Sequence, residues 1–218
     1  MKKIILASIT LVICLSATAC MFDNIKGSGK VTSETKNIGA FTNIRTSGSI
    51  DIEITQSETD AATVETDDNL QQYIVLENKN GTLEIHFKEN MSVNPTKAIV
   101  HLSCKKLEYI ASSGSGDIST KGNFKTGNLN ISHSGSGDFN LDVTLQKITF
   151  KKSGSGDVKL KGSADYFSIT SSGSGNTNAA ELTVPSALIR SSGSGDYVLK
   201  NGVKAEVAIS GSGDVSYK

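Results

Sequence analysis

The five-residue turn Ser113-Gly114-Ser115-Gly116-Asp117 decides the fold of this chain, because it recurs five more times. The later copies occupy residues 134–138, 153–157, 172–176, 192–196 and 210–214, and only the copy at 172–176 differs, since it ends in Asn. The last residues of successive copies lie 21, 19, 19, 20 and 18 positions apart. A period near twenty residues is typical of stacked-repeat proteins, in which each unit contacts only its neighbours.

Apolar and polar residues alternate on both sides of each turn. Leu129 and Ile131 precede the copy at 134–138, and Phe139 and Leu141 follow it. This alternation indicates β-strands, and two short strands with their turns fill one β-helix coil. The sequence therefore predicts an all-β fold, a single-stranded parallel β-helix or solenoid with about 20 residues per coil. Antiparallel hairpins in a β-sandwich could use the same turns and are the alternative.

Residues 38–110 are predicted to form a strand-rich N-terminal part of the same solenoid. Residues 50–54 alternate as a strand does, and Asn80-Gly81 suits a tight turn. The segment Ser47-Gly48-Ser49-Ile50-Asp51 resembles a degenerate copy of the repeated turn, and residues 69–74 are expected to form a short helical turn. A separate domain in this region is the alternative.

The repeats themselves, residues 111–218, are predicted to form the regular part of the solenoid. Six coils stacked at about 4.8 Å give a rod roughly 29 Å long. The last copy follows Ile209, whereas Ser, Lys or His precedes the other copies. This atypical coil is a candidate cap for the end of the stack.

The first residues read as a lipoprotein signal peptide over residues 1–19. Two lysines precede an apolar run, and the small residues Ala17-Thr18-Ala19 stand directly before Cys20. We expect Cys20 to be lipidated and residues 20–37 to form a flexible tether; cleavage of an ordinary secretory signal is the alternative. The residue after Cys20 is Met21, whereas an Asp at this position favours retention of a lipoprotein in the inner membrane. The expected location is the cell envelope, lipid-anchored in the outer membrane, on its periplasmic or its outer face.

Charge and cysteine content exclude several classes of protein. The chain has 22 basic and 22 acidic residues, so it lacks the positive field that nucleic-acid binding requires. Removal of residues 1–19 leaves 20 basic and 22 acidic groups, a net charge of −2. Cys104 then has no intramolecular disulfide partner, and we expect it to be a buried thiol. Nothing in the sequence indicates a cofactor.

The acidic residues that end the repeated turns form a predicted column along one edge. As weak candidates for metal ligands, they are Asp117, Asp138, Asp157, Asp196 and Asp214. The period argues against calcium repeats of the nine-residue type, and Asn176 interrupts the charges. Carboxylates stacked at this spacing repel one another, and splayed side chains, bound cations, or hydrogen bonds from Ser hydroxyls and turn N–H groups could relieve the repulsion. Asn can replace Asp at little cost in the hydrogen-bonded arrangement, which is therefore the favoured prediction.

No catalytic constellation emerges from the sequence. His86, His101 and His133 are scattered over strands and turns, and we expect each to be a surface residue. Some β-helix enzymes cleave polysaccharides with paired acids. The acids outside the turns that could serve in this way are Asp142, Asp165, Glu181 and Glu206. Since nothing pairs them, a protein that is not an enzyme is the prediction, with a polysaccharide-active enzyme as the less favoured alternative.

Three stretches followed by the repeated turns carry a family resemblance. Phe41-Thr42-Asn43-Ile44, residues 50–54 (Ile-Asp-Ile-Glu-Ile) and residues 80–85 (Asn-Gly-Thr-Leu-Glu-Ile) resemble the putative auto-transporter adhesin head GIN domain family over residues 38–218. The resemblance implies an exported bacterial protein with a β-solenoid-like fold and no catalytic residues. We therefore predict a non-catalytic, adhesin-like envelope lipoprotein whose flat, Ser/Gly/Asn-rich face binds glycan or protein. A structural role, with an open solenoid end forming a homo-oligomer, is the alternative.

Overall fold

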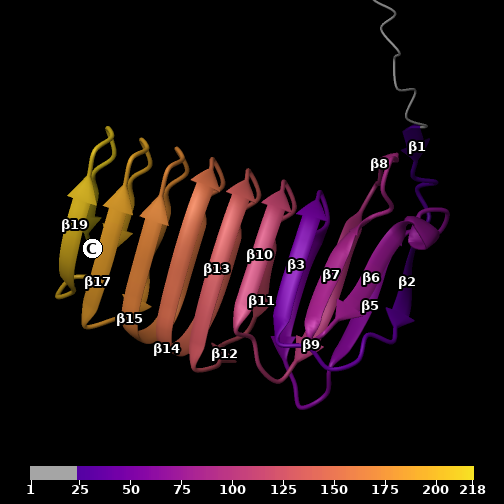
Figure 1. The fold of residues 1–218 in the computed structure, drawn as a ribbon, viewed down its shortest axis with the longest axis horizontal. Helices are drawn as coiled ribbons and strands as arrows, with labels where there is room; N and C mark the ends of the chain where they lie inside the picture. The colour runs from indigo at the N-terminus through magenta and orange to yellow at the C-terminus, as the bar shows by residue number, and fades with distance from the viewer. Residues whose placement is uncertain (1–23) are drawn as a thin grey trace, which may run out of the picture.

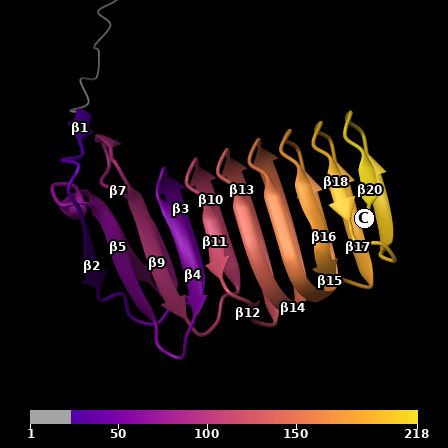
Figure 2. The same ribbon diagram turned by 180° about the vertical axis from the view of Figure 1, so that it is seen from behind.

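A computed structural model describes residues 24–218, so the predicted signal peptide and Cys20 lie outside the described residues. The strands form two columns that face each other along the length of a rod (Figures 1 and 2). The front column, labelled mainly in Figure 1, contains in spatial order β7 (Thr82–Phe87), β3 (Asn43–Gly48), β10 (Tyr109–Gly114), β13 (Asn128–Gly135), the second halves of β14 (Phe139–Gly154) and β15 (Val158–Ser171), β17 (Ser186–Ser191) and β19 (Lys204–Ile209).

The back column contains the strands that follow the turns (Figure 2). In the same spatial order, it consists of β9 (Ala98–Cys104), β4 (Asp51–Gln56), β11 (Ile118–Lys121) with β12 (Phe124–Lys125), the first halves of β14 and β15, β16 (Thr177–Thr183), β18 (Tyr197–Leu199) and β20 (Val215–Tyr217). All neighbouring strands named so far are parallel within each column. The predicted parallel β-solenoid is therefore confirmed, and the antiparallel sandwich is excluded.

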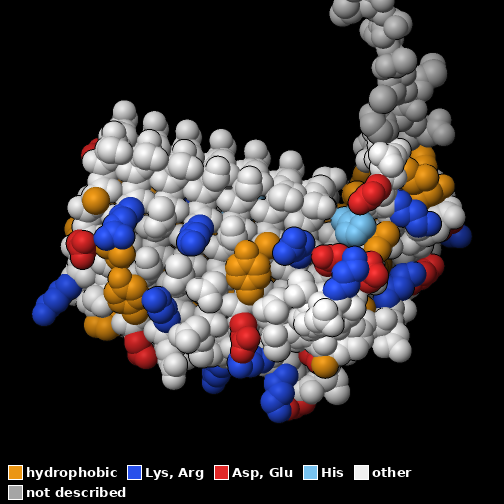
Figure 3. Space-filling model, in the orientation of Figure 1, with side chains coloured by type: hydrophobic (Ala, Val, Ile, Leu, Met, Phe, Trp, Pro, Cys, Tyr) orange, Lys and Arg blue, Asp and Glu red, His pale blue; other side chains and the backbone are white. Residues whose placement is uncertain are grey.

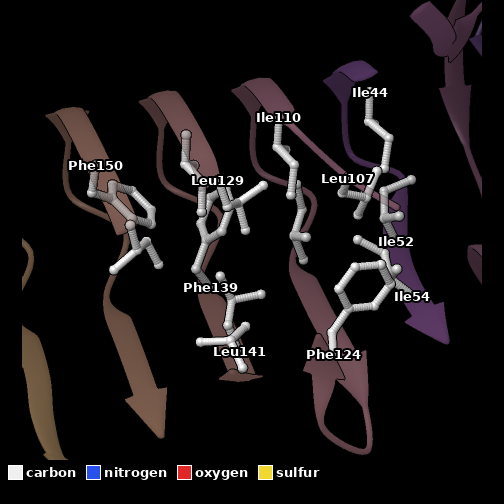
Figure 4. Close-up of a cluster of buried hydrophobic side chains, with 14 of the residues drawn as sticks. Ile44, Ile52, Ile54, Leu107, Ile110, Phe124, Leu129, Phe139, Leu141 and Phe150 are labelled. Carbon is white, nitrogen blue, oxygen red and sulfur yellow. The ribbon is translucent and has the colours of Figure 1, made fainter. Parts of the chain in front are cut away.

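Inward-facing apolar residues stack in register from coil to coil and form one continuous core. Ile110 pairs with Ile44 on one side and Ile131 on the other, and Ile131 pairs with Phe150. Figure 4 shows such side chains from both columns filling the space between them. The rings of Phe139 and Phe150, one from each column, meet edge to face with centroids 5.0 Å apart. Each coil buries only a few side chains, so neighbouring coils must fold together.

The glycines of the repeated turns are required because the turns stack on one another. A Cβ added at Gly137 would lie 2.1 Å from the carbonyl oxygen of Gly116 in the preceding coil. The coil of β3 and β4 has Ile50 at this turn position, and that side chain is buried. No Ser-Gly turn precedes it in the stack, because residues 88–97 connect β7 to β9 through β8. The predicted degenerate copy is therefore the first turn of the column.

The position directly before each turn points inward and is polar in six successive coils. These buried residues are Thr46, Ser112, His133, Lys152, Ser171 and Ser191. The expectation that His133 is a surface residue is wrong, because it continues the inward row of Leu129 and Ile131 and is only 2% exposed. Lys152 is tolerated in this row because its Nζ donates to the carbonyl oxygens of Gly156, at 2.9 Å, and Gly175.

Antiparallel strands cover the N-terminal end of the solenoid. β5 (Ala61–Asp67) lies between β9 and β2 (Val31–Lys36), and β6 (Ile74–Lys79) forms a hairpin with β7. Asn80 and Gly81 both have positive φ in the hairpin turn, which confirms the predicted tight turn. The expected helical turn is the 3-10 helix η1 (Gln71–Tyr73).

Stacking does not follow chain order at this end. The coil of β7 and β9 precedes the coil of β3 and β4 in space, although it follows that coil in the sequence. The β10 and β11 coil packs on the other side of β3 and β4. Residues 38–110 therefore belong to the same sheet system as the repeats.

Residues 24–36 differ from the flexible tether that we expected. β1 (Asn24–Lys26) pairs with β8 (Ser92–Asn94), and β2 pairs with β5. Between β1 and β2, the buried carboxylate of Asp67 accepts hydrogen bonds from the backbone N–H groups of Gly29, at 2.7 Å, and Thr96, at 2.8 Å. These charge-assisted hydrogen bonds hold residues 27–30 in place, although the Gly/Ser composition of this segment predicts a flexible linker.

Candidate functional site

A groove follows the front column directly below the repeated turns. Three shallow hollows of about 280, 290 and 380 Å³ share lining residues, so they form one continuous depression, which we call the front groove. Ser132 and Ser134 line both the first and the second hollow, and Thr170 and Ser192 line both the second and the third. The front groove therefore extends over the coils from β3 to β19.

Two outward-facing rows of residues build the front groove. The row within the turns consists of serines, among which Ser47, Ser113, Ser134 and Ser153 are in register. The second row lies two residues before each turn and contains, in spatial order, Arg45, Ala111, Ser132, Lys151, Thr170, Arg190 and Ala208. Figure 3 shows this face as a largely uncharged surface over β10 to β19 on which basic side chains stand apart. The result is a flat, hydroxyl-rich face.

The acidic column forms a hydrogen-bonded ladder along the turn edge. The Oδ1 atom of each residue accepts a bond from the backbone N–H of the corresponding residue in the next coil. The ladder runs from Asp51 through Asp117, Asp138, Asp157, Asn176 and Asp196 to Asp214, with N···Oδ1 distances of 2.7–3.0 Å. Asn176 takes part through its amide oxygen. Hydrogen bonds from turn N–H groups are thus the arrangement observed, and Ser hydroxyls are not the donors.

We predict that Asp138→Asn leaves stability nearly unchanged, whereas Asp138→Ala destabilises the protein by about 1–2 kcal/mol. The amide keeps the oxygen that accepts the Asp157 N–H, as Asn176 does in its own coil, and alanine leaves that donor without its partner. Urea unfolding of both variants checks this. Equal losses for Asn and Ala would show that the charge, rather than the hydrogen bond, stabilises the ladder.

The acids considered for polysaccharide cleavage do not come together. Asp142 accepts a hydrogen bond from Asn123 at 2.7 Å and lies 3.3 Å from Lys161; these contacts hold its pKa below the usual range. Glu181 lies 3.5 Å from Lys159, and Glu206 lies 3.8 Å from Arg190. Asp165 is exposed on β15. Each acid other than Asp165 therefore faces a cation and not a second acid.

On β9, the side chains of His101 and Cys104 have different surroundings, since His101 is partly exposed and Cys104 is buried. The ring of His101 lies between two carboxylates, with Nδ1 3.2 Å from Glu53 and Nε2 3.0 Å from Glu65. Burial raises the pKa of the Cys104 thiol to about 12, which leaves it protonated and unreactive. Among residues 24–218, no group of three or more His, Cys, Asp or Glu side chains is placed to hold a metal ion.

A sequence family described as putative auto-transporter adhesin, head GIN domain, matches residues 40–218. The chain belongs to this GIN-domain family. The match begins just before β3 and spans all the repeated turns, as the resemblance predicted. Membership identifies an adhesin-like protein of the cell envelope or cell surface. No helix among the described residues is long and apolar enough to cross a bilayer.

Solved crystal structures share the fold of this GIN-domain protein. A putative adhesin from Bacteroides fragilis NCTC 9343 has a TM-score of 0.80 and 25% identity, with 89% of this chain and 100% of that chain covered. A putative adhesin from Parabacteroides distasonis ATCC 8503 has a TM-score of 0.66 and 26% identity, with 90% and 100% covered. A putative lipid binding protein from the same strain has a TM-score of 0.70 at 23% identity, covers 89% and 99%, and shows the fold alone. No curated protein matches the sequence.

The buried histidine of the GIN domain makes its stability depend on pH. Burial, together with the neighbouring Lys152 charge, holds the pKa of His133 below its usual 6.5. The unfolded chain therefore takes up a proton near pH 6.5, whereas the folded chain does so only at lower pH. Because the unfolded state binds more protons in this window, stability is lost as pH falls below about 6.5.

We expect His133→Ser, which installs the residue found at Ser112 and Ser171, to remove this loss. Between pH 7.5 and 5.5, approximate bounds that bracket the free-histidine pKa, the free energy of unfolding of the wild type should fall further than that of the variant, by at most about 1.4 kcal/mol, the limit for one pH unit below the free-histidine pKa. Urea titrations at several pH values measure the difference. Parallel pH profiles for the two proteins would contradict the assignment to His133.

Proposed function

We propose that this protein is a non-catalytic, adhesin-like lipoprotein of the bacterial envelope that binds an extended ligand, glycan or protein, along the front groove. The observation that carries the proposal is the continuity of the groove over successive coils. A ligand with a linear backbone can contact it repeatedly, and many weak contacts sum to useful affinity. The rigid solenoid holds the groove residues in place before binding, which lowers the entropic cost of association.

A binding role suits the chemistry of the groove better than catalysis does. Its lining consists of hydroxyls, small residues and separated cations, and it contains no pair of acids at the spacing that glycoside hydrolysis requires. The acids considered for cleavage lie on other faces or face cations, as described above. We therefore assign the protein no enzymatic activity.

A lipid anchor on Cys20 would suit this role. The basis for the anchor is the signal-peptide pattern in the sequence, which ends at Ala19. We propose that a lipid on Cys20 holds the protein at the outer membrane. The adhesin-like family and the putative adhesins among the similar structures favour a position where the groove meets external ligands.

Two measurements on cells test the anchor and the location. Metabolic labelling with a fatty acid should mark the wild type and not Cys20→Ala; a label on both would place the lipid elsewhere. Protease added to intact cells should digest the protein while a periplasmic control stays whole. Protection until the outer membrane is opened would make contact with external ligands untenable.

A second candidate role is self-association through the last coil of the described chain. β19 and β20 each pair with a strand on one side, and Val207 and Tyr217 are 42% and 45% exposed in this coil. Strand edges with exposed apolar residues favour pairing with another chain. Sedimentation over a wide concentration range tests this, and a monomer throughout would exclude homotypic pairing.

A further inference from the structure

We infer that the front groove binds an acidic polysaccharide, with Arg45, Lys151 and Arg190 contacting its carboxylate or sulfate groups and Tyr109 stacking on a sugar ring. The inference rests on the proposed function, since it names the ligand class of the same groove. It assigns a role to four residues that lie on four different strands, β3, β10, β14 and β17.

The three cations share one register row and therefore line up along the groove. From Arg45, the row passes through Ala111 and Ser132 before it reaches Lys151, and it passes through Thr170 before it reaches Arg190. With about 4.8 Å between neighbouring strands, the cations are roughly 14 Å and 10 Å apart. Each cation lines a different hollow of the groove. A chain with acidic groups at intervals, separated by neutral sugars, matches this spacing.

The pairing of charges distinguishes this row from the back of the solenoid. Within residues 24–218, neither Arg45 nor Lys151 has a carboxylate within 4.0 Å, although Glu84 is the register neighbour of Arg45 on β7, and Arg190 lies 3.8 Å from Glu206. On the back column, the Nζ atoms of Lys121, Lys159 and Lys161 lie 3.3–3.5 Å from carboxylates. Lys151 is therefore the groove cation most open to an anionic ligand, and Arg45 and Arg190 have longer carboxylate contacts than the back-column cations.

Tyr109 supplies an aromatic surface at the hollow that contains Arg45. Its side chain is exposed on the outer side of β10, although aromatic side chains of this size are usually buried. It lines the 280 Å³ hollow together with Ala111. Asn43 and Asn130 flank it in register on the neighbouring strands. An aromatic ring between two amides, beside a guanidinium, offers the stacking and hydrogen bonds that a charged sugar uses.

The shape and charge of the protein favour a polysaccharide over a nucleic acid. The groove cations are few and separated by uncharged residues, and the chain predicted to remain after removal of residues 1–19 is acidic overall. A polymer with one phosphate per residue would place most of its charges against uncharged residues of the row. A polysaccharide with intermittent charge, by contrast, can place neutral hydroxyl-bearing units against the serine row.

The test measures binding of the full chain to immobilised polysaccharides at physiological salt. Hyaluronan supplies a carboxylate on every second sugar, keratan sulfate supplies sulfates on alternating sugars, dextran is the neutral glycan, and oligo-dT is a control polyanion with a charge on every residue. The groove variant Arg45→Ser/Lys151→Ser/Arg190→Ser is compared with the back-column variant Lys121→Ser/Lys159→Ser/Lys161→Ser, which loses the same charge. Tyr109→Ala is the third variant. Unfolding curves establish that each variant is folded before binding is measured.

We expect binding to at least one of the two acidic polysaccharides, and whichever binds better identifies the charged group. The groove variant should bind about tenfold more weakly, because each exposed ion pair contributes a factor of about two, whereas the back-column variant should bind as the wild type does. Tyr109→Ala should weaken binding at unchanged net charge.

Equal weakening in both triple variants, or equally tight binding to oligo-dT, would overturn the inference in favour of unspecific attraction. Binding to dextran without binding to either acidic polysaccharide would refute the acidic ligand and leave the proposed binding function standing. Failure to bind any of the three polysaccharides would refute the inference, and the proposed function would then depend on a protein ligand.

Discussion

Replacing Gly137 by alanine is expected to destabilise the protein by at least about 3 kcal/mol, more than ordinary overpacking of a core costs. The new Cβ would lie 2.1 Å from the Gly116 carbonyl oxygen and 2.8 Å from its carbon. Both are backbone atoms of the adjacent turn, so no side-chain rotation can relieve the contact. The turns would have to separate, and separation breaks the neighbouring Asp138–Asp117 bond of the ladder.

Gly127→Ala is the matched control for this prediction. Its Cβ would meet only the Gln146 side chain at 3.8 Å, and the backbone at Gly127 does not have the positive φ that disfavours alanine. We expect this variant to be neutral or stabilised by up to about 1 kcal/mol, because alanine restricts the unfolded chain. Thermal and urea unfolding compare the two. Similar stabilities would show that the turns tolerate a side chain and that close stacking does not explain the repeated glycine.

Truncation of Phe150 to alanine is expected to cost about 3–5 kcal/mol, the range for a large aromatic group in a closed core. The side chain is fully buried in a central coil, and its ring packs edge to face against Phe139. Its loss leaves a cavity that the neighbouring coils cannot easily fill, because hydrogen bonds on both sides fix the spacing of the strands.

Val207→Ala provides the comparison at the same register of the last coil. Phe150 pairs with Ile169, which pairs with Ile189 and then Val207, so the two sites share one register row and differ in side-chain size and in burial. Since Val207 is partly exposed, we expect its truncation to cost less than about 1 kcal/mol. Urea unfolding of each variant gives the comparison. A loss at Phe150 no larger than that at Val207 would mean that the coils do not share one continuous core.

Alternation and repeat spacing were sufficient to predict how each repeat is built. Residues two positions apart on a strand face the same way, so Leu129 and Ile131 before a turn and Phe139 after it had to face one core. The same parity would have placed His133 inside and Lys151 outside, if the strands had been aligned on the turns. Arg45, Ser132 and Arg190 share that alignment, each two residues before a turn, but they are recognisable as a row only when the strands are aligned on the turns.

The order of the N-terminal coils, the docking of the segment before them and the front groove could not be predicted in the same way. Nothing in the local pattern of residues 82–104 indicates that their coil precedes the coil at 43–56 in space. The segment at 27–30 has the composition of a linker, yet Asp67, far along the chain, fixes it in place. Non-local contacts of this kind depend on which arrangement buries the most apolar surface at an acceptable cost in loop closure.

The sequence by itself therefore determined the coil length, the two strands per coil, the stacked turns and the family, because strand periodicity and repeat spacing act locally and recur. Only the tertiary structure decided the order of the N-terminal coils, the docking of residues 24–36 and the joining of Arg45, Lys151 and Arg190 along one groove. These features arise where strands distant in sequence pair side by side. Their register is selected by the packing of the whole core, and no short stretch of residues carries that information.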